Sequence, residues 1–469
     1  MHQLNQRLDR LPLLPAHRWV IGIFVFAYFF ELADLSTFAY AAPQIIKIWG
    51  ITMHSVALIT SASFCGMFFG SLAGGGLADR FGRKPLFVAS VLFYTLSSLL
   101  NAFAWNIASL AIFRLMTGVG LSAMTVVATA YTMEYFPAVS RGKILSMIVA
   151  ISLVGIPATA WVARAVVPMG EHGWRFIFVW GALGILVIPA SIRKLSESPR
   201  WLFLHGEKAR ANAIVEQLEA VALQRHGVLA PLKPDSAPPH ETARMSYRQL
   251  LNPQYRSRFI VVTLMSICAS LGFYGFIAWV PTLLVQHGFS VVKSLSYSSM
   301  MAICNPLGAL LAMTVIERIE RKYFIVIAAV CIAVVVTLYG WTSNPVFIVI
   351  FGALAVMSLQ GNTVGVWTYQ SECFPTEIRS GATGFVYGVG RMANIVGPFI
   401  VSGLYGAFGY YSVFFYIAVC YLAGGAIAAI FGPKTTGRAL EDIGEAHAAS
   451  GEQSLPNGNV GSVNTRGLS

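Results

Sequence analysis

The sequence predicts an all-α membrane protein with twelve transmembrane helices in two pseudo-symmetric six-helix bundles. Three observations support this fold class: an apolar composition, twelve long apolar runs and an internal repeat. Of the 469 residues, 56% are hydrophobic and 11% are charged, and the mean hydropathy is +0.66. A soluble protein carries about 25% charged residues. The charges are therefore too few to cover a water-facing surface, and most of the surface must face lipid.

The apolar runs have the length of membrane spans. They lie near residues 19–42, 57–78, 86–104, 109–131, 145–165, 174–192, 259–284, 295–316, 323–341, 345–369, 381–405 and 411–432. Crossing about 30 Å of hydrocarbon takes roughly 20 apolar residues in a helix. Open sheets cannot satisfy their backbone groups in lipid, so helices are expected. No signal-peptide pattern precedes the first run, which we interpret as a retained span.

Positive charge is distributed unequally between the two sets of loops. One set holds the 193–258 segment, which is basic, and Arg80, Arg83, Lys84, Arg141, Lys143, Arg318, Arg321, Lys322 and Arg379. The opposite set holds little beyond Lys47, Arg175 and Lys293. Because cytoplasmic loops are enriched in Lys and Arg, we expect the first set and both termini to be cytoplasmic, in a cell (inner) membrane. The same pattern explains the net charge of +12 without nucleic-acid binding.

Four segments follow from this organisation. Residues 1–192 are expected to form the N-terminal bundle, 193–258 a cytoplasmic linker, 259–432 the C-terminal bundle and 433–469 a cytoplasmic tail. Within the linker, Ala209–Val221 is expected to form a short amphipathic helix, and the Pro-rich stretch Pro231–Pro239 an irregular connection. The tail is rich in Gly, Ser and Asn from about Ser450, a composition typical of disorder.

An internal repeat relates the two halves. A shift of 238 residues places Asp79-Arg80-Phe81-Gly82-Arg83-Lys84 on Glu317-Arg318-Ile319-Glu320-Arg321-Lys322. The same shift places Tyr131, Glu134, Pro137 and Arg141 on Tyr369, Glu372, Pro375 and Arg379. A constant offset across several helices indicates two homologous halves, and a parallel repeat of this kind is a transporter architecture.

Several motifs resemble those of the major facilitator superfamily over residues 15–442. Gly75-x-Leu77-Ala78-Asp79-Arg80-x-Gly82-Arg83-Lys84 is similar to its signature loop between helices 2 and 3, and Arg114-x-x-x-Gly118-x-Gly120 to its helix 4 motif. The segments Glu197-Ser198-Pro199-Arg200-Trp201-Leu202 and Pro433-Lys434-Thr435-Thr436-Gly437-Arg438 resemble the sugar-porter branch, with Lys434 in place of the usual Glu. The resemblance implies alternating access between two bundles.

A narrower resemblance is to the bacterial niacin-transporter group, related to organic-ion transporters. It rests on residues 273–281 (FYGFIAWVP), on His287-Gly288-Phe289-Ser290 and on Gly390-Arg391-x-x-x-x-Gly397-Pro398. It implies import of a small organic acid, nicotinate above all, by proton symport. The segment Phe30-Glu31-Leu32-Ala33-Asp34 departs from the Asp-Gly-x-Asp form of aromatic-acid symporters. Sugar–proton symport, drug or organic cation–proton antiport and a receptor without turnover remain alternatives.

Charges at the helix ends of the basic loops predict a gate. Opposite charges that pair only when the cytoplasmic side is closed would bias the equilibrium toward the outward-open state, provided that they form a network. Asp79 is also expected to face the N-terminus of helix 11, as the resemblance implies. The gate residues are Asp79, Arg80, Arg83, Glu134, Arg141, Glu317, Arg321, Glu372 and Arg379.

Charges inside the spans are the sharper signal, because each costs about 2.5–3.5 kcal/mol or more near the bilayer centre. Glu31 and Asp34 share one face of helix 1, and Arg391 lies near the middle of helix 11. We expect Asp34, with Glu31, to carry the proton and Arg391 to hold a carboxylate by two parallel hydrogen bonds. The competing structural interpretation pairs Asp34 or Glu31 with Arg391. Arg114 is either a hydrogen-bond hub or part of proton coupling.

Polar and aromatic residues within the spans complete the candidate substrate site. An aromatic-rich site with few hydrogen-bonding groups suits a flat ring. The candidates besides Arg391 are Tyr131, Trp161, Phe273, Tyr274, Trp279, Gln360, Asn362, Trp367, Tyr369, Tyr387 and Asn394. The sequence contains no phosphate-binding loop, zinc-ligand spacing or nucleophile beside a base. We therefore expect no enzyme, cofactor or metal, but a monomer whose partners are lipid, protons and a small organic acid.

Overall fold

The computed structural model describes residues 1–232, 252–374, 376–433 and 435 of the chain. Within these residues the regular elements are all helices, and twelve helical segments are long and apolar enough to cross a membrane. The predicted fold class is therefore confirmed. The Pro-rich stretch beyond residue 232 and most of the tail lie outside the described residues.

The N-terminal half contains six spans, built from helices that are short where the chain bends. The first four spans are α2 (Pro15–Trp49), α3 (Met53–Phe81), α4 (Arg83–Ala102) and α5 (Ile107–Tyr135). The fifth combines α6 (Arg141–Ser152), α7 (Gly155–Val166) and η1 (Val167–Met169), and the sixth combines α8 (Gly173–Ala182), η2 (Leu183–Val187) and α9 (Ile188–Lys194). Pro157 lies one turn beyond the break between α6 and α7, where its ring would clash with the carbonyl of Leu153.

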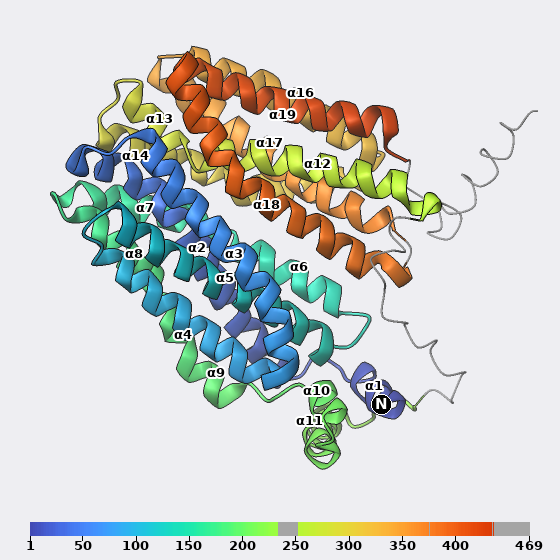
Figure 1. The fold of residues 1–469 in the computed structure, drawn as a ribbon. Coiled ribbons are helices and arrows are strands. Elements are labelled where there is room, and N and C mark those ends of the chain that lie inside the picture. Colours follow the sequence, from blue (N-terminus) through green and yellow to red (C-terminus); the bar gives the residue numbers. More distant parts are fainter. Residues whose placement is uncertain (233–251, 375, 434, 436–469) are drawn as a thin grey trace, which may run out of the picture.

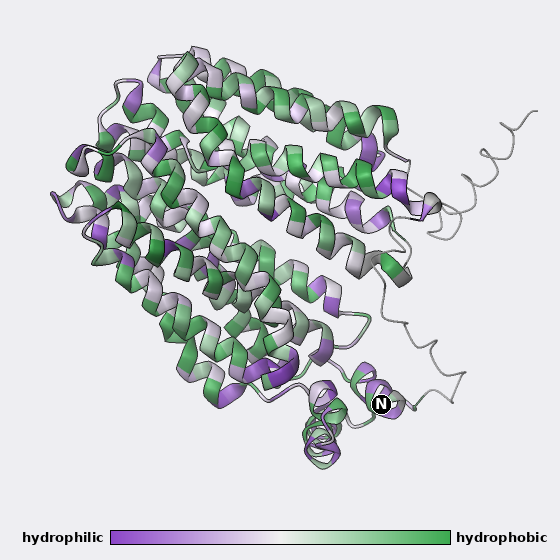
Figure 2. Ribbon diagram, viewed as in Figure 1, coloured by the Kyte–Doolittle hydropathy of each residue, from purple (hydrophilic) through white to green (hydrophobic). Residues whose placement is uncertain are grey.

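The C-terminal half repeats this plan. Its helices are α12 (Pro253–Ile277), α13 (Val280–Gln286), α14 (Val291–Ala302), α15 (Cys304–Val315), α16 (Arg321–Trp341), α17 (Pro345–Glu372), α18 (Thr376–Phe408) and α19 (Tyr410–Phe431). Figure 1 shows the two bundles side by side, and Figure 2 shows hydrophobic residues along the lengths of the helices, with hydrophilic ones concentrated at their ends.

Backbone contacts between α3 and α5 stiffen the N-terminal half. A Cβ added to Gly66 would lie 2.0 Å from the carbonyl oxygen of Leu115, and one added to Gly70 would lie 2.2 Å from that of Val119. On the facing helix, a Cβ on Gly118 would lie 2.2 Å from the carbonyl oxygen of Ser63. Small residues let helices approach this closely in lipid, where packing drives their association.

The two halves pack against each other mainly at one end of the molecule. We call the end with Arg83, Arg141 and Arg321 the basic end, and the end where α2 finishes at Trp49 the opposite end. α3 packs on α18, and toward the opposite end the rings of His54 and Phe399 of these helices lie 5.5 Å apart. At the same end α7 packs on α14 and α2 on α13. Figure 1 shows the bundles diverging toward the basic end.

The buried apolar clusters follow the same asymmetry. A single cluster at the opposite end joins residues of both halves, among them Phe38, Trp174, Phe276 and Leu283. At the basic end, one cluster belongs to the N-terminal half and another to the C-terminal half. The halves are thus joined by a large shared apolar core at the opposite end and by a small cluster of Leu153, Ile156 and Ala309.

Three helices outside the membrane spans lie at the basic end of the N-terminal half. The predicted linker helix is observed as α11 (Lys208–His226), preceded by α10 (Pro199–Leu204). An additional helix, α1 (His2–Asp9), lies against α11 through leucines that include Leu4 and Leu8. Arg7 and Arg10 each form an ion pair of 2.6 Å with Glu219 of α11. Burial raises the pKa of Glu219, but hydrogen bonds from both arginines outweigh it and hold that pKa below its ordinary value.

Candidate substrate and proton site

A cavity of about 250 Å³ lies between the two halves. The N-terminal half lines it with α2, α3, α5, α6 and α7, and the C-terminal half with α12, α17 and α18. Its volume is slightly below the roughly 300–1,000 Å³ of typical small-molecule pockets. The charged side chains in its lining are Glu31, Arg114 and Arg391. The cavity thus combines a mainly apolar wall with three ionisable groups.

Arg391 enters this cavity from α18, and its guanidinium is held at two positions. Nη2 donates a hydrogen bond of 2.5 Å to the Tyr387 hydroxyl, one helical turn away. Nη1 lies 2.9 Å from Sδ of Met67 in the other half. The Tyr387 ring also faces the guanidinium carbon, which lies 4.9 Å from the ring centroid. A phenol and a thioether are weak acceptors beside a carboxylate, so the guanidinium is oriented but not neutralised by these contacts.

Glu31 lines the same cavity from α2 and is 5% exposed. Among the described residues it forms no ion pair with Arg391, although the two charges interact. Tyr28 lies one turn before Glu31 and also lines the cavity, with its hydroxyl 2.8 Å from Oγ1 of Thr129. The cavity therefore holds an acidic group and a basic group from opposite halves that are near each other but not joined.

Asp34 has a different environment, because it is fully buried and paired within the N-terminal half. Its Oδ2 lies 3.2 Å from Nη1 of Arg114, and its Oδ1 accepts a hydrogen bond from Ser98. Arg114 is oriented in turn by Nε donating to Ser63 at 3.0 Å. The partner of Asp34 is thus Arg114 of α5, and not Arg391 as the competing structural interpretation supposed.

Aromatic rings from both halves cover the cavity. Phe64 of α3 meets Tyr274 of α12 edge to face, with centroids 4.8 Å apart, and Tyr274 contacts Phe273 at 5.2 Å. Trp367 of α17 lies 6.4 Å from Tyr387 in a T-shaped arrangement. Such rings supply flat apolar surface with polar edges, and this lining suits a planar ligand.

The structure brings part of the predicted substrate set together and leaves part elsewhere. The residues in the cavity lining are Phe273, Tyr274, Gln360, Trp367, Tyr387, Arg391 and Asn394. Tyr131 and Tyr369 lie outside it, donating to the carbonyls of Ser196 and Pro433 at the basic end. Trp161 is exposed beneath Arg164, and Asn362 donates to the carbonyl of Ile325. Trp279 is buried in the shared core at the opposite end.

Several cavity residues were not among the predicted ones. They include Tyr28, Phe64, Met67, Thr125 and Ser270. Tyr28 precedes Glu31 by three residues, so the face-sharing rule that linked Glu31 to Asp34 applies to it as well. Phe64 and Met67 lie in an apolar run that looks like ordinary packing, and only the position of α3 beside α18 identifies them.

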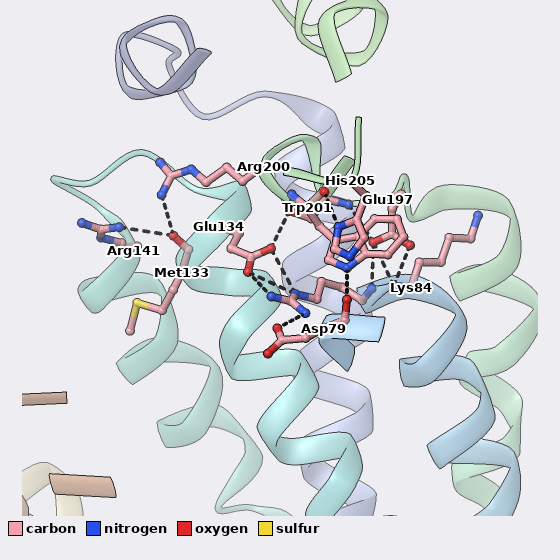
Figure 3. Close-up of polar contacts among 11 residues, drawn as sticks. Asp79, Lys84, Met133, Glu134, Arg141, Glu197, Arg200, Trp201 and His205 are labelled. Atoms are coloured by element: carbon pink, nitrogen blue, oxygen red, sulfur yellow. Dashed lines mark hydrogen bonds and ion pairs between the residues drawn. The ribbon is translucent and has the colours of Figure 1, made fainter. Parts of the chain in front are cut away.

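The charged loop residues of the N-terminal half form one connected network (Figure 3). Arg83 donates to Glu134 through Nε at 3.1 Å and Nη2 at 2.7 Å, and to Asp79 at 2.7 Å. Ser198 donates to the same Glu134 carboxylate at 2.5 Å. Oε1 of Glu197 accepts the backbone N–H of Arg83 at 2.9 Å, as an N-cap would. These groups all belong to the N-terminal half and its linker.

The C-terminal half has a corresponding but differently built network. Arg321 donates to Glu372 through Nε at 3.2 Å, and Thr435 donates to the other oxygen of Glu372 at 2.8 Å. The backbone N–H of Thr435 donates to Glu320 at 2.9 Å. The described ion pairs of both networks therefore lie within a half and not between halves.

The remaining predicted gate residues have separate surroundings. Arg141 donates to the carbonyl of Met133 at 3.3 Å, and Arg80 lies over the ring of Phe81. Glu317 is exposed, and its side chain forms no hydrogen bond or ion pair with the described residues. Arg379 lies in the first turn of α18, but its side chain is outside the described part of the chain. The gate and substrate roles of all these residues stay predictions.

Known proteins share this architecture over almost the whole chain. The family model for sugar (and other) transporters matches residues 20–447. The chain belongs to this family of the major facilitator superfamily. It is 40% identical over 437 residues to a Bacillus subtilis (strain 168) protein that carries the general name of a metabolite transport protein, covering 92% of this chain and 96% of that protein.

A second relative carries a more specific name. The chain is 30% identical over 446 residues to the niacin transporter of Acinetobacter baylyi, covering 94% of this chain and 99% of the relative. Among solved structures, the inward-open xylose transporter of Escherichia coli matches with a TM-score of 0.70 at 17% identity, covering 91% of this chain and 99% of that one. This likeness concerns the fold. The chain is thus a membrane transporter of small metabolites and not an enzyme, as the sequence predicted.

Proposed function

We propose that the protein is a secondary active transporter that imports a small aromatic carboxylic acid, nicotinate above all, together with a proton. The observation that carries this proposal is the Arg391 guanidinium in an aromatic cavity between the halves, held by a phenol and a thioether. A carboxylate is the acceptor that best matches two parallel guanidinium N–H groups. The niacin transporter among the relatives supports the same substrate.

The charges around the cavity support coupling to a proton. Asp34 and Arg114 offset each other as a buried pair, and ionised Glu31 offsets Arg391. A bound carboxylate would leave one uncompensated negative charge in a site of low dielectric, which costs several kcal/mol. A proton on Glu31 or Asp34 removes that charge. Substrate anion and proton therefore bind best together, which is the requirement for symport.

The loop charges support a membrane orientation with the basic end and both termini in the cytoplasm of a cell (inner) membrane. In that orientation the shared apolar core closes the outer side, while the halves diverge on the inner side. The described conformation then corresponds to an inward-facing state, from which substrate leaves into the cytoplasm.

Thermal stabilisation of the purified protein tests the substrate. A ligand at 100 times its dissociation constant stabilises the folded state by about 2.7 kcal/mol. We expect nicotinate to raise the melting temperature and nicotinamide, a hexose and a quaternary amine to leave it unchanged. A shift with the hexose alone would support sugar transport instead. Uptake into proteoliposomes separates a transporter from a receptor without turnover.

Two substitutions test the roles of the charged groups. Arg391→Ala is expected to weaken nicotinate binding roughly 10- to 150-fold, the effect of losing a hydrogen bond to a charged group. Arg164→Ala, which removes an arginine outside the cavity, is the matched control. If Asp34 and not Glu31 carries the proton, Asp34→Asn retains counterflow exchange and loses accumulation driven by a pH gradient. Unchanged affinity in the first variant would exclude the anchor role, and intact accumulation in the second would exclude Asp34 as a proton carrier.

A further inference from the structure

Glu31 is the one acidic side chain in the described cavity lining, and its position gives it a second use beyond proton coupling. It reaches the cavity from α2 of one half, whereas Arg391 reaches it from α18 of the other. The two groups interact through space without an ion pair. A ligand held between the halves by Arg391 therefore presents its far side to the half that carries Glu31.

We propose that protonated Glu31 donates a hydrogen bond to an acceptor on the ring of the bound acid, so that the site selects pyridine carboxylates over carbocyclic ones. This inference rests on the proposed function, in which Arg391 holds the carboxylate. Charge balance requires the cavity to gain one proton with the anion, and a neutral carboxyl group is a hydrogen-bond donor. The proton that accompanies the substrate then also takes part in recognising it.

The surroundings of Glu31 favour this role over a purely structural one. Tyr28 donates its hydroxyl hydrogen bond away from Glu31, to the backbone oxygen of Thr125 or to Thr129. The Thr125 side chain reaches the Glu31 carboxyl, but its hydroxyl also donates to the carbonyl of Leu121 at 2.9 Å. Asp34, the next acid on the same face, is already saturated by Arg114 and Ser98. The ionisable groups around Glu31 are Tyr28 and Asp34 in α2, Tyr94 in α4, Arg114 in α5, Tyr274 in α12, and Tyr387 and Arg391 in α18.

The physical basis of the selectivity is an unmade hydrogen bond. A buried donor that loses its partner costs more than a hydrogen bond contributes when it is formed. Benzoate has the same carboxylate and ring size as nicotinate but no ring acceptor, so it would leave the Glu31 hydroxyl unpaired. In picolinate the ring nitrogen is adjacent to the carboxylate and therefore lies at the Arg391 side, away from Glu31.

Binding of nicotinate, benzoate and picolinate to the full-length protein tests the proposal. Isothermal titration should give nicotinate a dissociation constant about 10- to 100-fold below those of benzoate and picolinate. In Glu31→Leu the three constants should become equal within about threefold. A nicotinate preference that survives in Glu31→Leu would overturn the inference.

Glu31→Gln separates recognition from proton uptake. The Gln side chain keeps an N–H donor but cannot be protonated, so the preference for nicotinate should remain while proton uptake on binding disappears. Titrations in two buffers of different ionisation enthalpy measure that uptake. Loss of the preference in Glu31→Gln with proton uptake intact would also contradict the proposal.

The outcomes for the inference and for the proposed function are distinguishable. If the wild-type protein binds none of the three acids, the assignment of an acid substrate fails. If it binds all three with equal affinity and Arg391→Ala abolishes binding, the acid site stands and the role of Glu31 in selecting the ring is refuted. Circular dichroism and size-exclusion chromatography of each variant establish that it is folded.

Discussion

The charge networks at the basic ends of the two halves descend from one repeat but connect their parts in different ways. In the N-terminal half, Glu197 of the linker reaches back to the start of α4 and accepts the backbone N–H groups of Arg83 and Lys84. In the C-terminal half, Glu320 precedes α16 and reaches out to the backbone of Thr435. In each half a carboxylate joins the start of a helix to the segment that follows the last span of that half. In the N-terminal half this carboxylate belongs to the segment, and in the C-terminal half it belongs to the residue before the helix.

This difference follows from two substitutions between the repeats. Gly82 stands where the second half has Glu320. Glu197 precedes Ser198 as Lys434 precedes Thr435, and these two hydroxyls make the equivalent hydrogen bonds to Glu134 and Glu372. Two contacts are the same in both halves, and we call them the common frame. Arg83 pairs with Glu134 as Arg321 pairs with Glu372. Tyr131 and Tyr369 each donate a hydrogen bond to the segment after the last span of their half. The common frame is thus present whether the connecting acid comes from the segment after the last span, as Glu197 does, or from the residue before the helix, as Glu320 does.

Removing the arginines should give the largest difference between the halves. Arg83 is buried and makes a forked contact with Glu134. Breaking such a pair leaves the partner charge uncompensated, and we expect Arg83→Ala to destabilise the protein by about 3 kcal/mol. Arg321→Ala should cost less, about 1 kcal/mol, because Nε of Arg321 lies 3.2 Å from Glu372, farther than the 2.7 Å between Arg83 and Glu134, and the pair is more exposed. Its Nη1 donates to the carbonyl of Ile316, which carries no net charge to be left uncompensated. Thermal unfolding in one detergent compares the variants, and equal losses would mean that the two frames are energetically equivalent.

Giving the N-terminal half the residue of the C-terminal half should have the next largest effect. Glu197→Lys removes the acceptor of the α4 N-terminus and places a cation beside Arg83 and Lys84, at a cost of about 2 kcal/mol. Glu207→Lys, which changes an exposed acid paired with Arg210, is the control and should cost no more than about 0.5 kcal/mol. Chemical denaturation of both variants measures the difference. A cost for Glu197→Lys no greater than the control would show that Glu197 does not act as a cap.

A smaller effect is expected at the glycine that distinguishes the two halves. Gly82 has φ = +99°, and a Cβ there would lie 2.5 Å from Oε2 of Glu197. Gly82→Ala should therefore destabilise the protein by about 1.5 kcal/mol. Gly142→Ala, at a helical position with open space around it, is the control and should be neutral or slightly stabilising. Thermal unfolding of the two variants decides, and parallel behaviour would contradict the backbone argument.

The smallest effect concerns the contact of α1 with α11, which only the N-terminal half has among the described residues. Arg7 and Arg10 hold the pKa of Glu219 below the ordinary value of a glutamate, about 4.3. The ion pairs of Glu219 therefore stabilise the contact fully at any pH above that ordinary value. This stabilisation is lost as the pH falls through the lowered pKa. Hydrogen exchange of α1 should be slow at pH 7 and accelerate relative to the rest of the protein below about pH 4. Glu219→Gln should remove this pH dependence, and an unchanged pH profile in that variant would assign it to another group.

The sequence predicted the fold well because lipid imposes strong constraints. Twelve apolar runs, loop charges and the repeat at 238 residues are each local patterns, and the helix α11 was visible as an amphipathic stretch. The short helix α1 was not predicted, because its two leucines lie among polar residues and their role becomes apparent only where they pack beside α11. The breaks within spans also depend on tertiary contacts that prolines alone do not reveal.

The candidate site was predicted in part, and the reason is geometric. Arg391, Glu31 and Tyr387 were identifiable because charge and aromatic rings are costly or informative inside a span. In the sequence Asp34 looked equivalent to Glu31. In the structure its position around the axis of α2 directs it toward Arg114 in its own half. Met67 carries no signal in the sequence and becomes relevant only through the contact between α3 and α18.

The shared apolar core at the opposite end also has a thermal consequence. Opening that end divides this core into the part that belongs to the N-terminal half and the part that belongs to the C-terminal half. Exposure of apolar surface to water carries a positive heat-capacity change, and the attraction between such surfaces weakens on cooling. The equilibrium between the two access states should therefore curve with temperature, and cold should favour the state in which the opposite end is open.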